Sequence, residues 1–440
     1  MADYTGGRRP HFVKDSTSLY PSAPMWLLYQ ITMALALLVA GPFLLLSRGR
    51  HYLETLPGRL GRYTGPIPDS PVWIHAVSVG EVGVAATLVE ALPAELPLLV
   101  TTITPTGQER ARAAFNQRAA VAYLPFDLGL PARRFLDRFS PQALVLVEGD
   151  LWPLVLRLVK QRGLPVVVVN GRISDRSFGR MRRVRPLLGP LLGRVDRFGV
   201  QTDDDRRRLT ELGVDGEKIT VTGNLKFESA PPGELPELEA SLREQAASRP
   251  ILVAGSTMGG EEEQVLDAFE RLGGGDRALL VLAPRHPERL GDVDKLLRER
   301  DIPMVTRSRL VPGARPAVVL LDTMGELASL YRVGSGAFIG GTLVPTGGHN
   351  PLEAARFSLP IAVGPSMENF QEMASKFDQD QAWQRVASAA ELAAVWEDWL
   401  THPETAAGMG ARAAELVTRN QGALERTLEI LAPLLRAETP

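Results

Sequence analysis

The run VWIHAVSVGE, residues 72–81, contains the pattern from which the fold of this chain can be inferred. Its first half is apolar and predicts a buried strand, which Ser78 and Gly80 then end. Glu81 follows at the start of a predicted helix. Continuous apolar strands that alternate with helices are typical of parallel sheets covered on both faces. The run therefore predicts an α/β fold with a carboxylate beyond the carboxyl end of a strand.

Further runs of this kind divide the chain into two series. Strands are predicted in a first series at residues 72–77, 96–103, 121–125, 143–148, 165–170, 197–202 and 218–223. A second series is predicted at residues 251–257, 278–284, 317–322, 336–341 and 360–364, after a segment rich in Pro and Glu. We predict two Rossmann-like domains, residues 51–230 and 250–440, joined by a linker at 231–249. Because ligands bind beyond the carboxyl ends of such strands, the domains are expected to face a shared cleft.

The composition excludes several functions. The 440 residues carry a formal charge of −2, which argues against a general nucleic-acid binder. The sequence has no cysteine, so disulfides, thiolate nucleophiles and cysteine-based zinc sites are excluded. Its six histidines show no metal-binding spacing, and no metal or cofactor is predicted.

One uncharged segment stands apart near the N-terminus. Residues 26–46 would span about 30 Å as a helix, which is the thickness of a bilayer core. We predict a membrane anchor within an N-terminal region of residues 1–50, with a signal peptide or a buried core helix as alternatives. Basic residues flank the segment on both sides, and their count leans slightly toward a body on the cytoplasmic side.

In the first half, polar residues gather where strands end. Besides Glu81, they occupy residues 101–107, 148–153, 170–174 and 223–226. These loops are expected to open on one edge of the sheet, where they suit an acceptor with hydroxyls and negative charge. Alternatively, Glu81 is an ordinary first-turn residue. Its negative charge would then interact favourably with the helix dipole and stabilise the helix by about a few tenths of a kcal/mol.

In the second half, glycine-containing loops lie between strands and helices at residues 254–263, 322–331 and 340–355. Such loops present backbone N–H groups to phosphate. Arg285 follows another strand, at the same expected edge. Asn350 and Glu353 are three residues apart, so they can share one face of a helical turn. A carboxylate there could bind a sugar diol, and the alternative is a capping box.

These motifs together resemble a known family. The runs HAVSVGE, TTITPTG, EGDLWP, VTGNLK, APRHPER, MGELASLY and GGHNPLEAA stand in the order found in 3-deoxy-D-manno-octulosonic acid (Kdo) transferases. The resemblance implies a two-domain GT-B glycosyltransferase at the inner membrane, with its catalytic body in the cytoplasm. It also implies metal-independent, inverting transfer of Kdo from CMP-Kdo to a lipid A precursor, lipid IVA.

The resemblance also implies roles for particular residues. Glu81 would be the general base, and Glu148 a second important acid. Donor binding falls on Ser256, Arg285, Met324, Gly325, Glu326, Leu327, Asn350 and Glu353. Contacts in the acceptor region of the cleft are predicted at Ser78, Gly80, Thr104 and Lys226. Arg180, Arg182 and Arg183 are candidates for contacts with lipid phosphates.

The chain departs from the family pattern at Asp150, Leu154 and Met258, which puts substrate detail in question more than the reaction class. Two alternatives stay open. One is another membrane-associated nucleotide-sugar transferase, against which HAVSVGE and GGHNPLE argue together. The other is a membrane protein that binds a sugar nucleotide without catalysis, against which the retained Glu81 argues.

Overall fold

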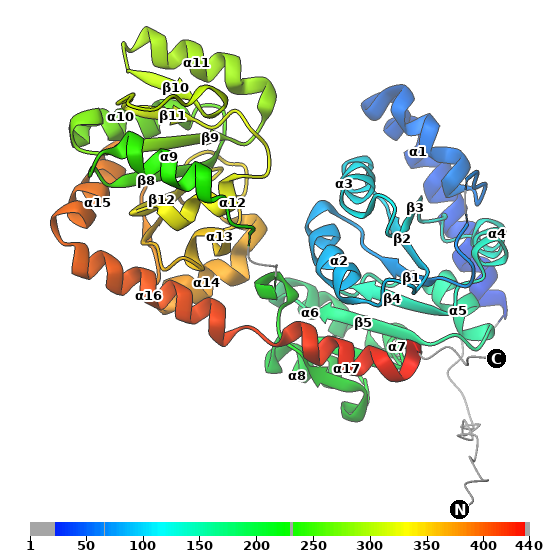
Figure 1. The fold of residues 1–440 in the computed structure, drawn as a ribbon. Helices are drawn as coiled ribbons and strands as arrows, with labels where there is room; N and C mark the ends of the chain where they lie inside the picture. Colours follow the sequence, from blue (N-terminus) through cyan, green and yellow to red (C-terminus); the bar gives the residue numbers. More distant parts are fainter. Residues whose placement is uncertain (1–22, 66, 229–231, 436–440) are drawn as a thin grey trace, which may run out of the picture. The chain divides into compact units, whose positions relative to one another are not determined.

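The computed structural model describes residues 23–65, 67–228 and 232–435, apart from the side chains of residues 23, 40 and 42–52. The chain divides into two compact units (Figure 1). The first comprises residues up to Gly223 together with those from Glu425 onward, and the second comprises Asn224–Leu424. Each unit is built around one seven-stranded sheet.

The sheet of the first unit is parallel throughout, in the order β3-β2-β1-β4-β5-β6-β7. Its strands are β1 (Val72–His75), β2 (Leu98–Thr102), β3 (Ala120–Tyr123), β4 (Ala143–Val147), β5 (Val166–Gly171), β6 (Arg197–Val200) and β7 (Ile219–Val221). The strand order reverses between β1 and β4, and ligands of open α/β sheets bind at such a switch point. This parallel sheet confirms the α/β prediction for the first series of strands.

The helices of the first unit connect these strands and cover the sheet. They are α1 (Ala23–Arg59), α2 (Val79–Ala91), α3 (Pro105–Phe115), α4 (Gly129–Phe139), α5 (Pro153–Gln161), α6 (Asp175–Arg183), α7 (Arg185–Leu192) and α8 (Asp203–Glu211). Helix α17 (Ala423–Leu435) also packs here, since Arg426 Nε donates to the carbonyl of Thr222 at 2.8 Å. The predicted domain boundaries differ at this point, because they assign the whole C-terminal end to the second domain.

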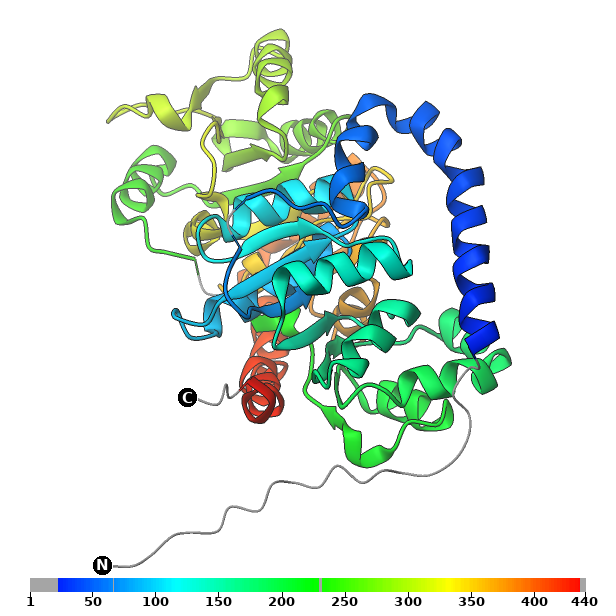
Figure 2. The same ribbon diagram turned by 90° about the vertical axis from the view of Figure 1, so that its right-hand side faces the viewer.

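Helix α1 runs beside this sheet (Figure 2). Trp26 on its inner face is buried, with its ring under the guanidinium groups of Arg157 at 4.6 Å and Arg194 at 5.4 Å. The anchor predicted at residues 26–46 lies in this helix, and the side chains of residues 40 and 42–46 are outside the described set. Among the described residues, no helix is both long and apolar enough to cross a membrane, so the anchor is not confirmed.

The sheet of the second unit is also parallel, in the order β10-β11-β9-β8-β12-β13-β14. Its strands are β8 (Ile251–Thr257), β9 (Leu279–Pro284), β10 (Met304–Thr306), β11 (Val318–Leu320), β12 (Gly336–Ile339), β13 (Ile361–Val363) and β14 (Gln384–Arg385). Alternate residues of β8 enter two separate cores, with Val253 in one and Leu252 and Ala254 in the other. Both faces of the sheet are therefore covered, which explains the continuous apolar runs.

The helices of the second unit are α9 (Pro236–Ala246), α10 (Glu262–Leu272), α11 (Leu290–Glu299), α12 (Leu327–Leu330), α13 (Leu352–Ala355), α14 (Gln371–Gln379), α15 (Ala389–Thr401) and α16 (Pro403–Arg419). Helix α9 corrects the predicted linker at 231–249, of which residue 231 lies outside the described residues. Leu238 and Leu242 of α9 are buried in the core of the second unit, so this Pro- and Glu-rich segment is part of the domain.

Candidate active site and donor site

Glu81 lies at the switch point of the first sheet, in the first turn of α2. Its carboxylate turns back toward the chain that leaves β1. One oxygen accepts a hydrogen bond from the backbone N–H of Val77 at 2.8 Å, and the other accepts one from the hydroxyl of Ser78 at 3.0 Å. The side chain is 9% exposed. These bonds fix the carboxylate and leave it with further capacity to accept hydrogen bonds. Glu81 can therefore be both a first-turn residue of α2 and a catalytic residue.

Burial raises the pKa of Glu81 to about 7, and the nearby negative charges of Glu148 and Asp150 act in the same direction. The hydrogen bonds from Val77 and Ser78 oppose this rise, because they favour the charged form. A carboxyl group whose pKa lies near neutral pH is suited to accept a proton at physiological pH. This part of the first unit is thus able to provide general-base chemistry.

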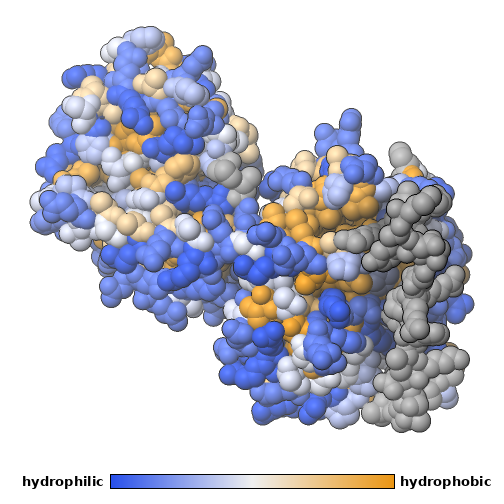
Figure 3. Space-filling view, turned by 60° about the horizontal axis from the view of Figure 1, so that its bottom comes forward, coloured by the Kyte–Doolittle hydropathy of each residue, from blue (hydrophilic) through white to orange (hydrophobic). Residues whose placement is uncertain are grey.

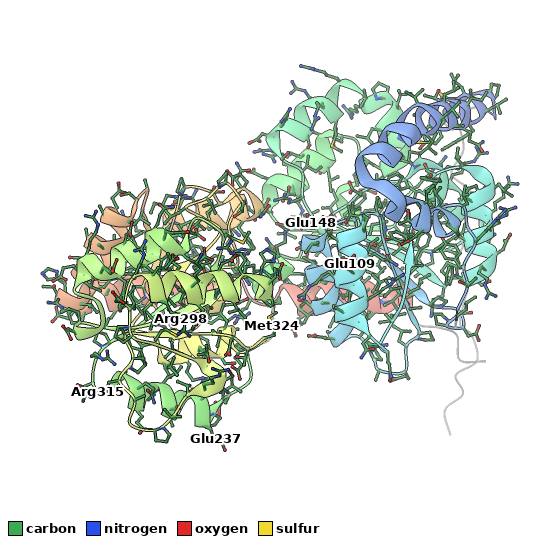
Figure 4. All side chains as sticks on the ribbon, turned by 90° about the horizontal axis from the view of Figure 1, so that it is seen from above. Glu109, Glu148, Glu237, Arg298, Arg315 and Met324 are labelled. Atoms are coloured by element: carbon green, nitrogen blue, oxygen red, sulfur yellow. The ribbon has the colours of Figure 1, made fainter. Side chains whose placement is uncertain are left out.

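Glu148 follows β4, the strand beside β1, and is labelled in Figure 4. Its backbone has a φ of +59°, which is uncommon for a residue with a side chain. The Nδ2 atom of Asn170, which has a φ of +54°, lies 3.4 Å from one oxygen of Glu148, and Nε of Arg172 lies 3.7 Å from the other. Such strained positions concentrate at functional sites, where the surrounding structure holds them in place.

A polar network connects β1 and β2 with the loop after β4. Nε1 of Trp152, in the EGDLWP run, lies 3.2 Å from Nε2 of His75, whose Nδ1 lies 2.9 Å from Oγ1 of Thr101. Burial lowers the pKa of His75 to about 4, so its ring is neutral and can accept the indole hydrogen bond. His75 and Trp152 were not singled out from the sequence, because an apolar strand context hides a polar pair that meets only in three dimensions.

The remaining acceptor-side predictions have different outcomes. Ser78 contacts Glu81 directly, and Gly80 is exposed, with room for a Cβ atom. Oγ1 of Thr104 accepts a hydrogen bond from the N–H of Gly107 at 3.0 Å and so caps α3. Lys226 belongs to the second unit, in the short 3₁₀ helix η2 (Leu225–Glu228), apart from the other three.

Five of the predicted donor residues line one cavity of about 150 Å³ in the second unit: Ser256, Arg285, Met324, Gly325 and Leu327. The loops that follow β8, β9 and β11 form it. Ser256 has a φ of +57°, and the backbone N–H of Arg285 donates to the carbonyl of Thr257 at 2.9 Å. The structure therefore brings together residues that are far apart in the sequence, at the carboxyl edge of the sheet.

The turn after β11 presents its backbone at this cavity. Gly325 adopts a φ of +84°, and Met324, labelled in Figure 4, is 70% exposed. The carboxylate of Glu326 points elsewhere, because it accepts hydrogen bonds from Nε and Nη2 of Arg307, both at 3.0 Å. The side chain of Glu326 thus holds the turn, and Arg307 is a residue that the sequence analysis did not single out.

Asn350 precedes α13, and Glu353 lies in the first turn of that helix. The side-chain oxygen of Asn350 accepts from the N–H of Leu352 at 3.1 Å, and Pro351 rather than Asn350 stands at the N-cap position, which corrects the predicted capping box. Burial raises the pKa of Glu353, whereas Arg285, Arg356 and Asn350 favour its charged form. Burial, together with the charge of Arg285, lowers the pKa of the neighbouring His349 to about 4. The loop before α13 thus carries a neutral imidazole, and the first turn of α13 carries a carboxylate that interacts with two arginines.

Two parallel α/β units with polar strand ends are the architecture of GT-B glycosyltransferases. A glycosyltransferase from Rickettsia africae has a similar structure, with a TM-score of 0.52 at 13% identity, over 84% of this chain and all of that one. At that identity the likeness concerns the fold alone.

Sequence comparison identifies the family. The family model described as 3-deoxy-D-manno-octulosonic-acid transferase (kdotransferase) matches residues 54–229. The 3-deoxy-D-manno-octulosonic acid transferase of Haemophilus influenzae is 35% identical over 401 residues, which cover 89% of this chain and 94% of that protein. The transferase of the same name from Bordetella pertussis is 33% identical, over 85% of this chain and 90% of its own length. This chain belongs to the Kdo transferase family, as its motifs indicated.

Proposed function

We propose that this glycosyltransferase moves Kdo from CMP-Kdo to a lipid A precursor, lipid IVA, during lipopolysaccharide assembly. Family membership supports the reaction class, and the near-neutral pKa of Glu81 supports its role as the base. The first unit would bind the acceptor and the second the donor.

In this reaction Glu81 takes the proton of an acceptor hydroxyl, whose oxygen forms the new bond to the anomeric carbon of Kdo. The bond from that carbon to the phosphate oxygen of CMP breaks, and its electron pair leaves with CMP. Attack from the side opposite the leaving group inverts the anomeric configuration. Hydrogen bonds from Val77 and Ser78 hold the carboxylate for this step, and burial, together with the charges of Glu148 and Asp150, keeps its pKa high. The site thus has a base with a matched pKa.

On the donor side, Arg285 is proposed to bind phosphate through its guanidinium fork. Backbone N–H groups of the Met324–Leu327 turn would bind the base and phosphate, and Ser256 adds a hydroxyl in the same cavity. Asn350 and Glu353 would accept hydrogen bonds from the ribose diol. The proximity of Arg285 to Glu353, which is reflected in the pKa of Glu353, supports their assignment to one ligand.

Attachment to the inner membrane, with the body in the cytoplasm, is also proposed, through α1. Its outer face carries exposed apolar side chains, including Leu28 at 63%, Leu38 at 71% and Val39 at 77%. Its other face is fixed to the body, since the Tyr29 hydroxyl donates to Asp127 at 2.5 Å and Gln30 accepts from the N–H of Gly129 at 3.1 Å. Figure 3 shows a further group of hydrophobic residues on the face of the first unit, the right-hand body, that is turned toward the viewer.

Vesicle flotation tests the role of α1. Changing Leu28 and Leu38 together to Asp should lower binding to anionic vesicles at least tenfold, because each buried leucine contributes about 2 kcal/mol. Changing the exposed Val311 of the second unit to Asp is the matched control and should leave binding unchanged. Equal flotation of the double variant and the wild type would refute the attachment.

Helix α6 is the proposed contact for lipid phosphates of the acceptor. It buries no residue, and Arg180, Arg182 and Arg183 lie in its last turn. It follows β5, which stands beside β4 in the sheet. Reversing these three charges together should raise the apparent acceptor KM and leave the KM for CMP-Kdo unchanged. An unchanged acceptor KM would remove the three arginines from the lipid site.

The reaction itself is tested with the wild-type protein in membranes, supplied with CMP-Kdo generated in situ and a tetra-acylated lipid A precursor. Transfer is expected, and CMP but not UDP should protect the purified protein against heat. A ligand at a hundredfold its Kd adds about 2.7 kcal/mol of stability. Protection by CMP without transfer would favour a binding protein, whereas protection by UDP alone would favour another nucleotide-sugar transferase.

A further inference from the structure

Glu261 is a buried carboxylate at the switch point of the second sheet. It stands at the N-cap position of α10, in the loop after β8, and its side chain makes no capping bond to that helix. Strand β12 is the neighbour of β8 on the side away from β9. The side chain of Glu261 has no exposed surface. A charge buried to this degree is costly unless hydrogen bonds compensate it, so its partners show why it is kept.

Four backbone N–H groups donate to this one carboxylate. One oxygen accepts from Gly341 at 2.6 Å and from Met258 at 3.0 Å. The other accepts from Thr342 and Leu343, both at 2.8 Å. Burial raises the pKa of Glu261, and all four bonds oppose that rise because they favour the charged form. The carboxylate thereby joins the loop after β8 to the loop after β12.

The three consecutive donors of the β12 loop form a concave site of a kind that binds anions such as phosphate. Gly341, with a φ of +70°, supplies the turn that lets these N–H groups converge. Because Glu261 fills this site from within the protein, the site is not free for the phosphate of a donor. The loop is therefore organised before any ligand arrives.

Contacts extend from this loop to the proposed donor residues. The N–H of Gly348 and the hydroxyl of Thr346 donate to the carbonyl of Gly341 at 2.8 and 2.9 Å. A Cβ atom on Gly341 would lie 2.8 Å from the His349 ring, so ring and loop are in close contact. On the other side, a Cβ on Gly340 would lie 2.3 Å from the carbonyl oxygen of Ser256, so the two loops cannot separate without disturbing Ser256.

We infer that Glu261 is a positioning residue for the donor: it holds the loops after β8 and β12 so that Ser256 on one and His349 to Glu353 on the other keep their nucleotide-binding geometry. This inference rests on the proposed function, since it assigns a support to the donor site. Glu261 contacts only backbone groups in this role and takes no part in the chemistry.

The experiment measures CMP binding by calorimetry on the full chain, with the KM values of both substrates. Glu261→Gln keeps the shape but sets an NH₂ group against two of the four donors. It should raise the Kd for CMP and the KM for CMP-Kdo at least tenfold and leave the acceptor KM within twofold. Glu261→Asp keeps the charge on a shorter side chain, so it should raise the Kd for CMP and the KM for CMP-Kdo by a smaller factor and again leave the acceptor KM within twofold. If the Gln variant does not fold, the Asp variant tests the inference.

Glu239→Gln is the control for lost stability. Glu239 is a largely buried carboxylate of the same unit that pairs with Arg332 at 3.3 Å, and neither residue belongs to the loop after β8 or to the loop after β12. Its variant should be less stable and bind CMP as the wild type does. A folded Glu261 variant with wild-type CMP affinity, or equal changes in both KM values, would overturn the inference. Failure of the wild type to bind CMP would instead remove the donor assignment, and the inference with it.

Discussion

Glu81 and Glu261 occupy equivalent places in the two units and have opposite surroundings. Each follows the first strand of its sheet, at the switch point, where a helix begins. Glu261 receives four backbone hydrogen bonds, from residues of two loops. Glu81 receives two, and two other acids lie close enough to raise its pKa. The same position in a fold can thus hold either a carboxylate that stabilises its surroundings or one that is ready to accept a proton.

The two carboxylates differ in how much of their capacity to accept hydrogen bonds is already used. A buried group whose lone pairs are all engaged contributes to rigidity, because any change leaves donors without partners. A buried group with spare acceptor capacity is costly to the fold, and such groups cluster at functional sites. The first unit accepts that cost at Glu81, whereas the second uses Glu261 to organise its loops. Measurements on variants of both residues test this difference.

The largest expected effect is on transfer by Glu81→Gln. Gln keeps the size of the side chain and can accept from the N–H of Val77, but it cannot take a proton. Transfer from CMP-Kdo should fall by about 10²-fold or more while CMP binding is kept. The control is Glu90→Gln, at an exposed position of the same helix, which should retain full activity. If Glu81→Gln transfers well, the base lies elsewhere, and Glu148 is the next candidate.

A smaller loss is expected on the donor side from Arg285→Lys. Lysine keeps the charge but lacks the planar fork that binds phosphate at two points. The Kd for CMP should rise about tenfold, which corresponds to one charge-assisted hydrogen bond of about 1.4 kcal/mol. Arg298→Lys, at an exposed pair with Asp294, serves as the control and should bind CMP normally. Unchanged CMP affinity in Arg285→Lys would take Arg285 out of the phosphate site.

The two glutamates also show how far sequence reasoning reaches. Glu81 was predicted because other strand ends in the same half of the chain also carry polar groups, and because the motif around it resembles a family. Glu261 was not, because it stands in the run GGEEE, where three acids before a helix look like ordinary first-turn residues. Only the three-dimensional course of the loop at residues 341–343 distinguishes it from Glu262 and Glu263.

The fold was predictable where burial leaves a strong pattern. Apolar runs predicted all seven strands of the first sheet and five of the seven strands of the second. The strands β10 and β14 were missed because they have only three and two residues, with side chains that are not fully buried. Helix α9 was taken for a linker, since its proline and glutamates obscure the spacing of Leu238 and Leu242. Arg307 was missed because its partner, Glu326, was assigned to the donor.

Stability should respond in opposite directions to the two Gln substitutions. For Glu81 the folded-state pKa is raised from 4.5 to about 7, so the folded protein holds its proton over that range and the unfolded chain does not. The contribution of Glu81 to the free energy of unfolding therefore decreases as the pH rises from 4.5 to about 7. At pH 8, Glu81→Gln should stabilise the first unit by about 1–3 kcal/mol.

Glu261→Gln, in contrast, should destabilise the second unit by about 2–4 kcal/mol, because two backbone donors lose their acceptor in a buried site. Urea unfolding followed by tryptophan fluorescence gives the direction of each midpoint shift, and the two units need not unfold together. Shifts in the same direction for both variants would contradict the contrast between a spare and a satisfied carboxylate.

The smallest effect is a shift of the pH profile. A protonated Glu81 cannot accept a proton, so kcat/KM should fall about tenfold per pH unit below the pKa of about 7 and level off above it. The charge of Asp150 contributes to that raised pKa. Asp150→Asn should therefore move the acidic limb to lower pH by less than about one unit, since the charges of exposed or half-exposed groups are screened. Glu90→Gln removes an exposed charge of the same helix and should leave the limb in place. If Asp150→Asn leaves the limb where it is in the wild type, Asp150 has no part in tuning the base, and burial together with the charge of Glu148 accounts for the raised pKa of Glu81.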